Sequence, residues 1–344
     1  MEVTTLNKGN IPINSVEIGD YILSSNNTFE KVINKSSKNC ESKGKKIRFF
    51  YLGKSYILNC PDNYKILTLN EDAPFWKNVS DIQVGDYCYV PINDVEYDYV
   101  DFTYVKHLNQ VKSKELHNVL DDLDWWWCVG YYLGDGWYQK RRKRNGKWQR
   151  STRMTLGCNP KQCNYIASRF SKFFKCNIQK DKRKIVFSNA CFYNFVKVLG
   201  DNALEKHLPY DFTMYPLDVL SALIDGYMYA DGFTTEGFLS CNSISKELMY
   251  QVFIAWIKIY KIMPYMSFVK TKPTTEIDGR IVNQRDYWQV RINLDKSSQH
   301  FGKYFNGFWI KTKNVGDISF SGKLPIFDLG CDVGYAVNGV AVKH

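Results

Sequence analysis

The chain has 344 residues and a formal net charge of +11 at pH 7, from 46 Lys and Arg against 35 Asp and Glu. Hydrophobic residues make up 44% of it and aromatic residues 16%, which excludes a disordered chain and predicts globular cores. The excess of cations favours a polyanionic partner, although a lysine-rich solvated surface has the same charge. The length allows two or three domains, or one domain inserted into another.

Cysteine usage and the polar N-terminus favour an intracellular location. The ten cysteines include no C-x-x-C pair, so reduced thiols are expected. A zinc site formed by Cys158, Cys163 and Cys176 is an irregularly spaced alternative. The sequence has no signal-peptide pattern and no run of 18 apolar residues, so no membrane partner is expected. We expect the nucleus if the host is a eukaryote, and otherwise the cytoplasm.

Residues 1–100 predict short strands joined by turns. Residues 16–23 predict a turn that enters a strand, and residues 82–90 repeat its Gly-Asp-Tyr sequence. A hairpin is predicted between residues 47–52 and 55–58, around Gly53. The repetition predicts a pseudo-symmetric all-β unit, and its opening segment resembles the Hint fold of inteins and hedgehog autoprocessing domains.

After a polar link, a helix is predicted from about Asp121 to Asp135. It ends in an apolar run, residues 129–136 (Val-Gly-Tyr-Tyr-Leu-Gly-Asp-Gly), and residues 224–232 (Ile-Asp-Gly-Tyr-Met-Tyr-Ala-Asp-Gly) end in the same Asp-Gly. In each run a small residue recurs after four positions, at Gly130 and Gly134 and at Gly226 and Ala230. Small residues one helical turn apart line one stripe, so two such helices can bring their backbones unusually close.

The acids Asp135 and Asp231 are predicted to lie at two adjacent helix C-termini, with Gly136 and Gly232 in left-handed caps. A carboxylate there opposes the helix dipole, and two carboxylates brought together repel each other. A bound divalent cation would reverse both effects. The alternative is a pair of buried helices, each ending in an incidental acid.

The two runs resemble the paired motifs of LAGLIDADG homing endonucleases, although Leu133 and Tyr229 stand where that family often has Asp. The resemblance implies metal-dependent hydrolysis of DNA phosphodiester bonds, with Mg²⁺ or Mn²⁺ as the cofactor. The metal ligands that it implies are the carboxylates and preceding carbonyls of the two runs: Asp135, Asp231, Gly134 and Ala230.

Family members also keep a lysine near each site. Residues 206–209 (Lys-His-Leu-Pro) resemble the block that carries the first lysine, so Lys206 is implied to order water or to offset transition-state charge. For the second site Lys296 is the first choice and Lys303 the alternative. His207 beside a proline is expected to be structural or exposed.

A strongly basic stretch follows the first acid, with eight cations in residues 139–153 and no acid among them. Cations interleaved with Gln and Trp suit a β-ribbon that holds phosphates and reads base edges in the major groove of DNA. A solvated loop or a nuclear localisation signal has the same composition. The predicted DNA contacts are Lys140, Arg141, Arg142, Arg144, Lys147, Gln149, Arg150 and Arg153.

The order helix, hairpin, helix, hairpin, helix is predicted twice. The first pass continues with residues 161–175, 178–182, 184–188 and 191–199, and the second with 234–242, 246–261 and a hairpin in 265–293 turning at Asp278-Gly279. Two such αββαββα halves with pseudo-two-fold symmetry would form a saddle over a duplex. A second face for DNA, or a solvated sheet surface, is predicted at Lys270, Lys272, Arg280, Arg285 and Arg291.

The C-terminus carries two further strand patterns, residues 326–329 and 335–344, which resemble the final blocks of inteins. The residues for protein splicing are replaced, however. Asn63 stands where a His is expected, and Lys343 and His344 stand where the closing His-Asn pair is expected. The chain also begins with Met1 rather than with a nucleophilic Cys or Ser, so splicing is expected to be lost.

The sequence therefore predicts an α+β fold, an all-β Hint-like domain (1–117 and 305–344) split by an inserted nuclease domain (118–304) with halves of about 118–205 and 206–304. We expect a free-standing monomer with internal pseudo-symmetry that cuts double-stranded DNA at a long asymmetric site. The alternatives are a non-cleaving DNA- or RNA-binding protein of maturase or regulator type, and a self-splicing intein.

Overall fold

The computed structural model describes residues 1–6, 8–51, 54–70, 73–93, 95, 120–139, 141–144, 147–150, 152–272, 274–277, 280–283, 285–295 and 307–343. The chain divides into two compact units. One contains Met1–Val95, Tyr260–Ser267 and Lys296–His344, and the other contains Glu96–Ile259 and Phe268–Asp295. In the described part of the chain, no helix is long and apolar enough to cross a membrane.

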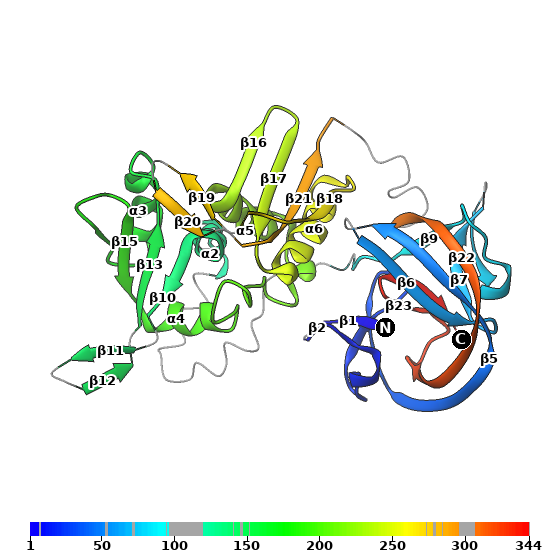
Figure 1. Ribbon diagram of the computed structural model, residues 1–344. Helices are drawn as coiled ribbons and strands as arrows, with labels where there is room; N and C mark the ends of the chain where they lie inside the picture. Colours follow the sequence, from blue (N-terminus) through cyan, green and yellow to red (C-terminus); the bar gives the residue numbers. More distant parts are fainter. Residues whose placement is uncertain are drawn as a thin grey trace. The chain divides into compact units, whose positions relative to one another are not determined.

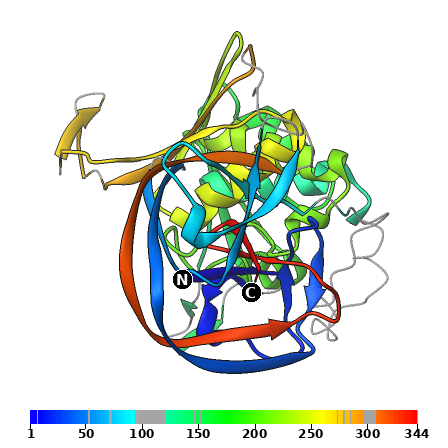
Figure 2. The same cartoon turned by 90° about the vertical axis from the view of Figure 1, so that its right-hand side faces the viewer.

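The first unit is built on a twelve-stranded sheet with the order β4-β3-β1-β23-β24-β7-β9-β22-β5-β6, with β2 beside β1 and β8 beside β7. Strands from the two ends of the chain alternate in it. Its long strands β5 (Asn34–Tyr51) and β22 (Phe308–Asp328) lie side by side as a curved ribbon in Figure 2. The other strands are β1 (Glu2–Thr5), β2 (Gly9–Pro12), β3 (Tyr21–Leu23), β4 (Phe29–Lys31), β6 (Lys54–Pro61), β7 (Lys65–Leu69), β8 (Pro74–Asn78), β9 (Tyr87–Val90), β23 (Tyr335–Val337) and β24 (Val340–Lys343).

The repeated Gly-Asp-Tyr segments form the same turn in this unit. Gly19 and Gly85 both have positive φ, 95° and 102°, which a residue with a side chain rarely adopts. The carboxylates of Asp20 and Asp86 each accept the amide hydrogen of the residue three positions earlier, at 2.8 Å. Each carboxylate also pairs with a lysine ammonium from earlier in the chain, that of Lys8 or Lys77. The predicted internal repeat is therefore confirmed at the level of backbone and side-chain geometry.

The two predicted passes lie in the second unit apart from Tyr260–Ser267, and Figure 1 shows their sheets as separate groups of strands. The helix predicted after the second hairpin of the second pass lies outside the described residues. The first pass is α2 (Leu123–Asp135), β10 (Gly136–Tyr138), β13 (Arg153–Gly157), α3 (Cys163–Ser171), β14 (Asn177–Ile178), β15 (Lys184–Ser188) and α4 (Ala190–Lys197). The second is α5 (Leu217–Asp231), β16 (Gly232–Thr235), β17 (Phe238–Ser243), α6 (Lys246–Tyr260), β18 (Tyr265–Val269) and β21 (Tyr287–Asn293). The sheet orders β10-β13-β15-β14 and β16-β17-β21-β18 correspond strand for strand.

Two extra hairpins distinguish the passes. In the first, β11 (Arg141–Arg144) and β12 (Lys147–Arg150) interrupt the connection between β10 and β13. In the second, β19 (Thr274–Ile277) and β20 (Arg280–Asn283) interrupt the connection between β18 and β21. The two halves are therefore alike in their cores and different in their extensions.

The core of the first half follows from strict alternation in its strands. Met154 and Leu156 are buried on one face of β13, as are Ile185 and Phe187 on β15. The rings of Phe187 and Phe174 stack with centroids 4.6 Å apart, beneath α3 and α4. The opposite face of this sheet carries the partly or fully exposed side chains, because successive residues of a strand point to opposite sides.

Candidate functional site: two helix ends and one lysine

The helices α2 and α5 pack along their small residues, as predicted. A Cβ atom placed on Gly130 would lie 1.9 Å from the carbonyl oxygen of Leu223. A Cβ atom on Gly226 would lie 2.0 Å from the carbonyl oxygen of Trp127. Real Cβ atoms do not approach backbone so closely, so glycine is required at both positions. The resulting contact brings the two backbones together over most of the length of the helices.

This packing places the two acids at adjacent helix ends. A Cβ atom on Gly134 would lie 2.4 Å from the Cβ of Ala230 and 3.3 Å from Oδ2 of Asp231. The carboxylate of Asp231 therefore lies against the last turn of α2, which itself ends at Asp135. Both acids are partly buried.

Burial changes the ionisation of both acids. The pKa of Asp135 is raised to about 6, chiefly by burial and also by the charge of Asp231, while the ammonium of Lys206 acts to lower it. Burial also raises the pKa of Asp231, again opposed by Lys206. Raised pKa values mean that the protein stabilises the charged form of each carboxylate less well than water does. Such a pair is typical of sites that bind a cation.

The charge of the Lys206 ammonium acts on both acids. Lys206 follows α4 by nine positions, and its ammonium donates to the carbonyl oxygens of Tyr132 at 3.3 Å, Gly134 at 3.2 Å and Gly136 at 2.8 Å. Burial lowers its pKa to about 8, while Asp231 and Asp135 act to raise it. The residue is also held from the second half, because the hydroxyl of Ser245 donates to its carbonyl oxygen at 2.6 Å.

The predicted left-handed caps are wrong. Gly136 has φ −95° and ψ 148°, and Gly232 has φ −92° and ψ 159°, so both are extended. The chain runs directly from each helix into a strand, β10 or β16, without the reversal that a left-handed cap produces. Glycine is needed for space instead, because a Cβ atom would lie 2.5 Å from the carbonyl oxygen of Tyr132 or 2.3 Å from that of Met228.

Two tyrosines that the sequence reasoning missed support the acids. Tyr131 and Tyr227 each precede an acid by one helical turn, and both are buried. The Tyr131 hydroxyl donates to the carbonyl oxygen of Gly157 at 2.7 Å, and the Tyr227 hydroxyl to that of Asn242 at 2.9 Å. These bonds fix each helix end to the second strand of its own sheet. The signal was present, since a Gly-Tyr pair recurs at the same place in both runs.

The donor set fits a hard divalent cation. Carboxylate and carbonyl oxygens are the ligands that Mg²⁺ and Mn²⁺ prefer, and the helix ends carry them at Asp135, Asp231, Gly134 and Ala230. Of these, the Gly134 carbonyl oxygen also accepts the hydrogen bond from Lys206. Among the described residues no group of three or more His, Cys, Asp or Glu side chains is arranged to hold a metal ion. A cation bound here would therefore need further oxygens from water or a substrate, and the cysteine alternative has no support.

The remaining predicted residues lie elsewhere or outside the described part. Lys140, Lys296, Lys303 and His344 lie outside the described residues. The predicted β-ribbon forms as β11 and β12, but the description excludes the side chains of Arg141, Arg142, Arg144, Lys147, Gln149 and Arg150, as well as that of Arg280 in β20. Among the predicted DNA contacts, the side chains that are described are all exposed: Arg153, Lys270, Lys272, Arg285 and Arg291.

Three residues outside the acid site can also be placed. Asn63 is exposed, and Lys343 pairs with Asp332 at 2.5 Å. His207 stacks on Tyr210 with centroids 4.4 Å apart, and burial lowers its pKa. The position of His207 is therefore compatible with the expected structural role.

No protein-family model and no curated protein matches the sequence. Among solved structures, the chain is similar to I-DmoI in complex with DNA and Mn, at 16% identity and a TM-score of 0.35, covering 50% of this chain and 90% of that one. It is similar to the N-terminal LAGLIDADG domain of DUF199/WhiA at 10% identity and a TM-score of 0.30, covering 57% and 86%. For the LAGLIDADG homing endonuclease I-GzeII in complex with its DNA target, the values are 7%, 0.28, 49% and 77%.

Proposed function

We propose that the protein is a metal-dependent endonuclease that cuts both strands of duplex DNA at a long asymmetric site. The observation that supports this proposal is the junction of α2 and α5, where Asp135 and Asp231 interact electrostatically with Lys206 from the loop after α4. Buried carboxylates with raised pKa values beside a lysine with a lowered one are more typical of a reacting site than of a structural ion pair.

Each residue has a role that its geometry supports. Bound Mg²⁺ or Mn²⁺ would supply an activated water and charge compensation at the phosphate. Asp135 and Asp231 would hold the ions, each from its own helix end, so that each half serves one strand of the duplex. Lys206, held by two carbonyl oxygens of α2 and by that of Gly136 at the start of β10, would orient the attacking water or offset negative charge on the phosphate.

The two sheets supply a surface suited to a duplex. Cations stand exposed in both halves, and the ribbon β11–β12 carries a further basic stretch. Phosphate contacts by such residues supply affinity and fix the register of the protein on DNA. The extra hairpins interrupt different connections in the two halves, which favours an asymmetric target read by a single chain.

The proposal is tested by selecting cleaved molecules from a plasmid library with a randomised insert, with Mg²⁺ or with EDTA. We expect the wild type to linearise a defined subset of plasmids with Mg²⁺ only. Asp135→Asn and Asp231→Asn should bind the same duplex with nearly unchanged affinity and fail to cut both strands. Retention of specific duplexes without linearisation would identify a binding protein instead, and cleavage by the Asp variants would exclude the assigned site.

A further inference from the structure

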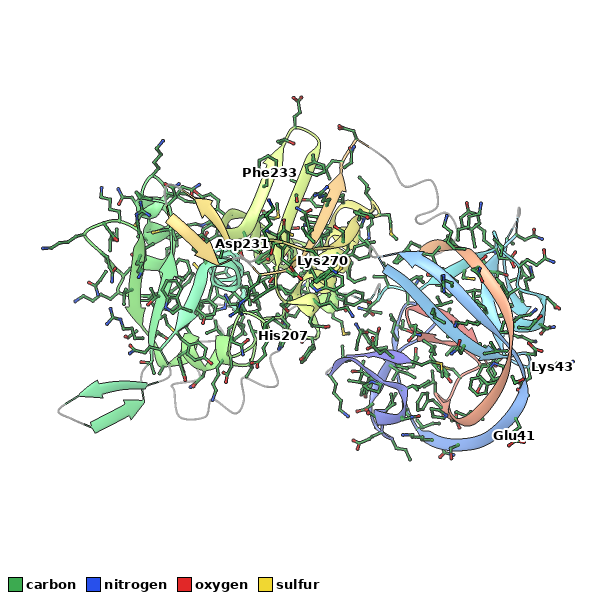
Figure 3. All side chains as sticks on the ribbon, viewed as in Figure 1. Glu41, Lys43, His207, Asp231, Phe233 and Lys270 are labelled. Carbon is green, nitrogen blue, oxygen red and sulfur yellow. The ribbon has the colours of Figure 1, made fainter. Side chains whose placement is uncertain are left out.

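Each acid is followed, two positions later, by an exposed aromatic side chain. Trp137 on β10 is 45% exposed and Phe233 on β16 is 61% exposed. Both occur in the sequence Asp-Gly-aromatic, directly after the paired helices. In Figure 3 Phe233 stands on β16 beyond Asp231. The pseudo-symmetry of the two halves therefore presents two aromatic rings, one beside each acid.

The rings lie on the faces of the sheets that the helices leave uncovered. Trp137 pairs across strands with Thr155, and Phe233 with Ser240. The flanking Gly136 is buried and Gly232 is partly buried, on the faces opposite to the two rings. In both halves, then, the exposed aromatic residue has a short hydroxyl-bearing residue as its cross-strand neighbour.

A cation lies near the first ring, and polar side chains lie one strand beyond the cross-strand neighbour of the second. The Lys184 ammonium lies 5.9 Å from the centroid of a Trp137 ring. In the second half Arg291 is the cross-strand neighbour of Ser240, and its guanidinium donates to the side-chain oxygen of Gln289. The partner that complements these surroundings must carry both flat apolar surfaces and negative charge, and stacked bases between phosphates meet both requirements.

A single exposed aromatic residue on a surface needs no explanation. Two exposed aromatic residues at equivalent positions of the two halves are harder to explain by chance. Each half would have to expose apolar surface independently at the same place. Both also follow directly from the residues that hold the acids.

We propose that Trp137 and Phe233 wedge against the base pairs that lie between the two cleaved phosphodiesters, unstacking them and bending the duplex. This inference rests on the proposed function and extends it to the mode of DNA deformation. Apolar side chains inserted between base steps bend DNA in this way, and the cost depends on the sequence being unstacked. The wedges would therefore add sequence preference at central positions, where flexible pyrimidine–purine steps are expected.

The test begins with duplexes selected by binding to the wild type in EDTA, so that recovery does not depend on cutting. 2-Aminopurine is then placed at each central position in turn, and its fluorescence reports unstacking. We expect a fluorescence rise with the wild type that is lost at one side with Trp137→Ala and at the other with Phe233→Ala. Each substitution should weaken binding roughly tenfold, about 1.4 kcal/mol.

Matched variants separate this effect from damage to the fold. Tyr165→Ala removes an aromatic residue of similar exposure, 48%, from α3 and should leave the fluorescence unchanged. Trp137→Phe and Phe233→Tyr keep a ring and should restore the signal. If the alanine variants keep the wild-type signal while Mg²⁺ supports cutting, the wedge is overturned and the nuclease stands. If the signals respond but no cutting occurs, the wedge stands and the nuclease fails, and if no duplex is enriched both are rejected.

Discussion

In the absence of metal, the charged carboxylate of Asp135 should destabilise the folded protein. Asp135→Asn should therefore increase the free energy of unfolding. Its folded-state pKa is about 6, against 3.8 for the free side chain, because it is buried beside Asp231. For a group with a raised acid pKa, the folded chain binds a proton that the unfolded chain releases. Stability is therefore lost as the pH rises from the unfolded value through about 6.

The size of the effect follows from that shift. Two pKa units correspond to about 3 kcal/mol at pH 7, which is an upper bound because asparagine keeps the shape of the side chain but changes its hydrogen bonds. In EDTA at pH 7 we expect the free energy of unfolding of Asp135→Asn to exceed that of the wild type by roughly 1–3 kcal/mol. The difference should fade as the pH falls through about 4, because the aspartate then becomes protonated in the unfolded chain as well as in the folded one.

Urea unfolding followed by tryptophan fluorescence measures this, since three consecutive tryptophans lie in α2. Addition of Mg²⁺ should stabilise the wild type but not the variant. The control is Asp20→Asn, in the other unit. Although burial raises the pKa of Asp20, hydrogen bonds from Lys8 and from the Glu17 amide lower it below its usual value overall. This variant should destabilise above about pH 4, with the loss fading as the pH falls through the lowered pKa. A less stable Asp135→Asn at pH 7 would refute the reasoning and make the carboxylate a structural group.

Three further changes test the packing and the site. Gly130→Ala places a Cβ atom 1.9 Å from the Leu223 carbonyl oxygen. Although alanine gains about 1 kcal/mol in helix propensity, this variant should lower the urea midpoint of unfolding and abolish cutting. Gly316→Ala, where a Cβ atom meets nothing within 4 Å, is the control and should do neither. Lys206→Met should leave duplex binding almost unchanged in a gel-shift assay and reduce the rate of cutting by at least about tenfold; equal rates would remove it from the site. Tyr227→Phe removes the bond to the Asn242 carbonyl oxygen and should destabilise by about 1 kcal/mol in thermal unfolding, with an unshifted melting temperature as the contrary result.

Local patterns account for the features that the sequence predicted correctly. The helix before Asp135 and the small residues at Gly130 and Gly226 follow from helical periodicity, which needs no knowledge of the rest of the chain. The turns at Gly19 and Gly85 follow from a Gly-Asp-Tyr sequence that occurs twice. In each case the residues that decide the geometry lie within a few positions of one another.

The tertiary structure decided what joins distant segments. The extended backbone at Gly136 depends on the strand that follows it, and the hydrogen bond of Tyr131 depends on a carbonyl 26 positions away. Lys206 reaches the Gly134 carbonyl oxygen across 72 positions, and only packing of the loop after α4 against both halves brings it there. Periodicity and turn chemistry act over a few residues, whereas the ionisation of Asp135 and Lys206 arises from burial and neighbours that only the folded chain brings together.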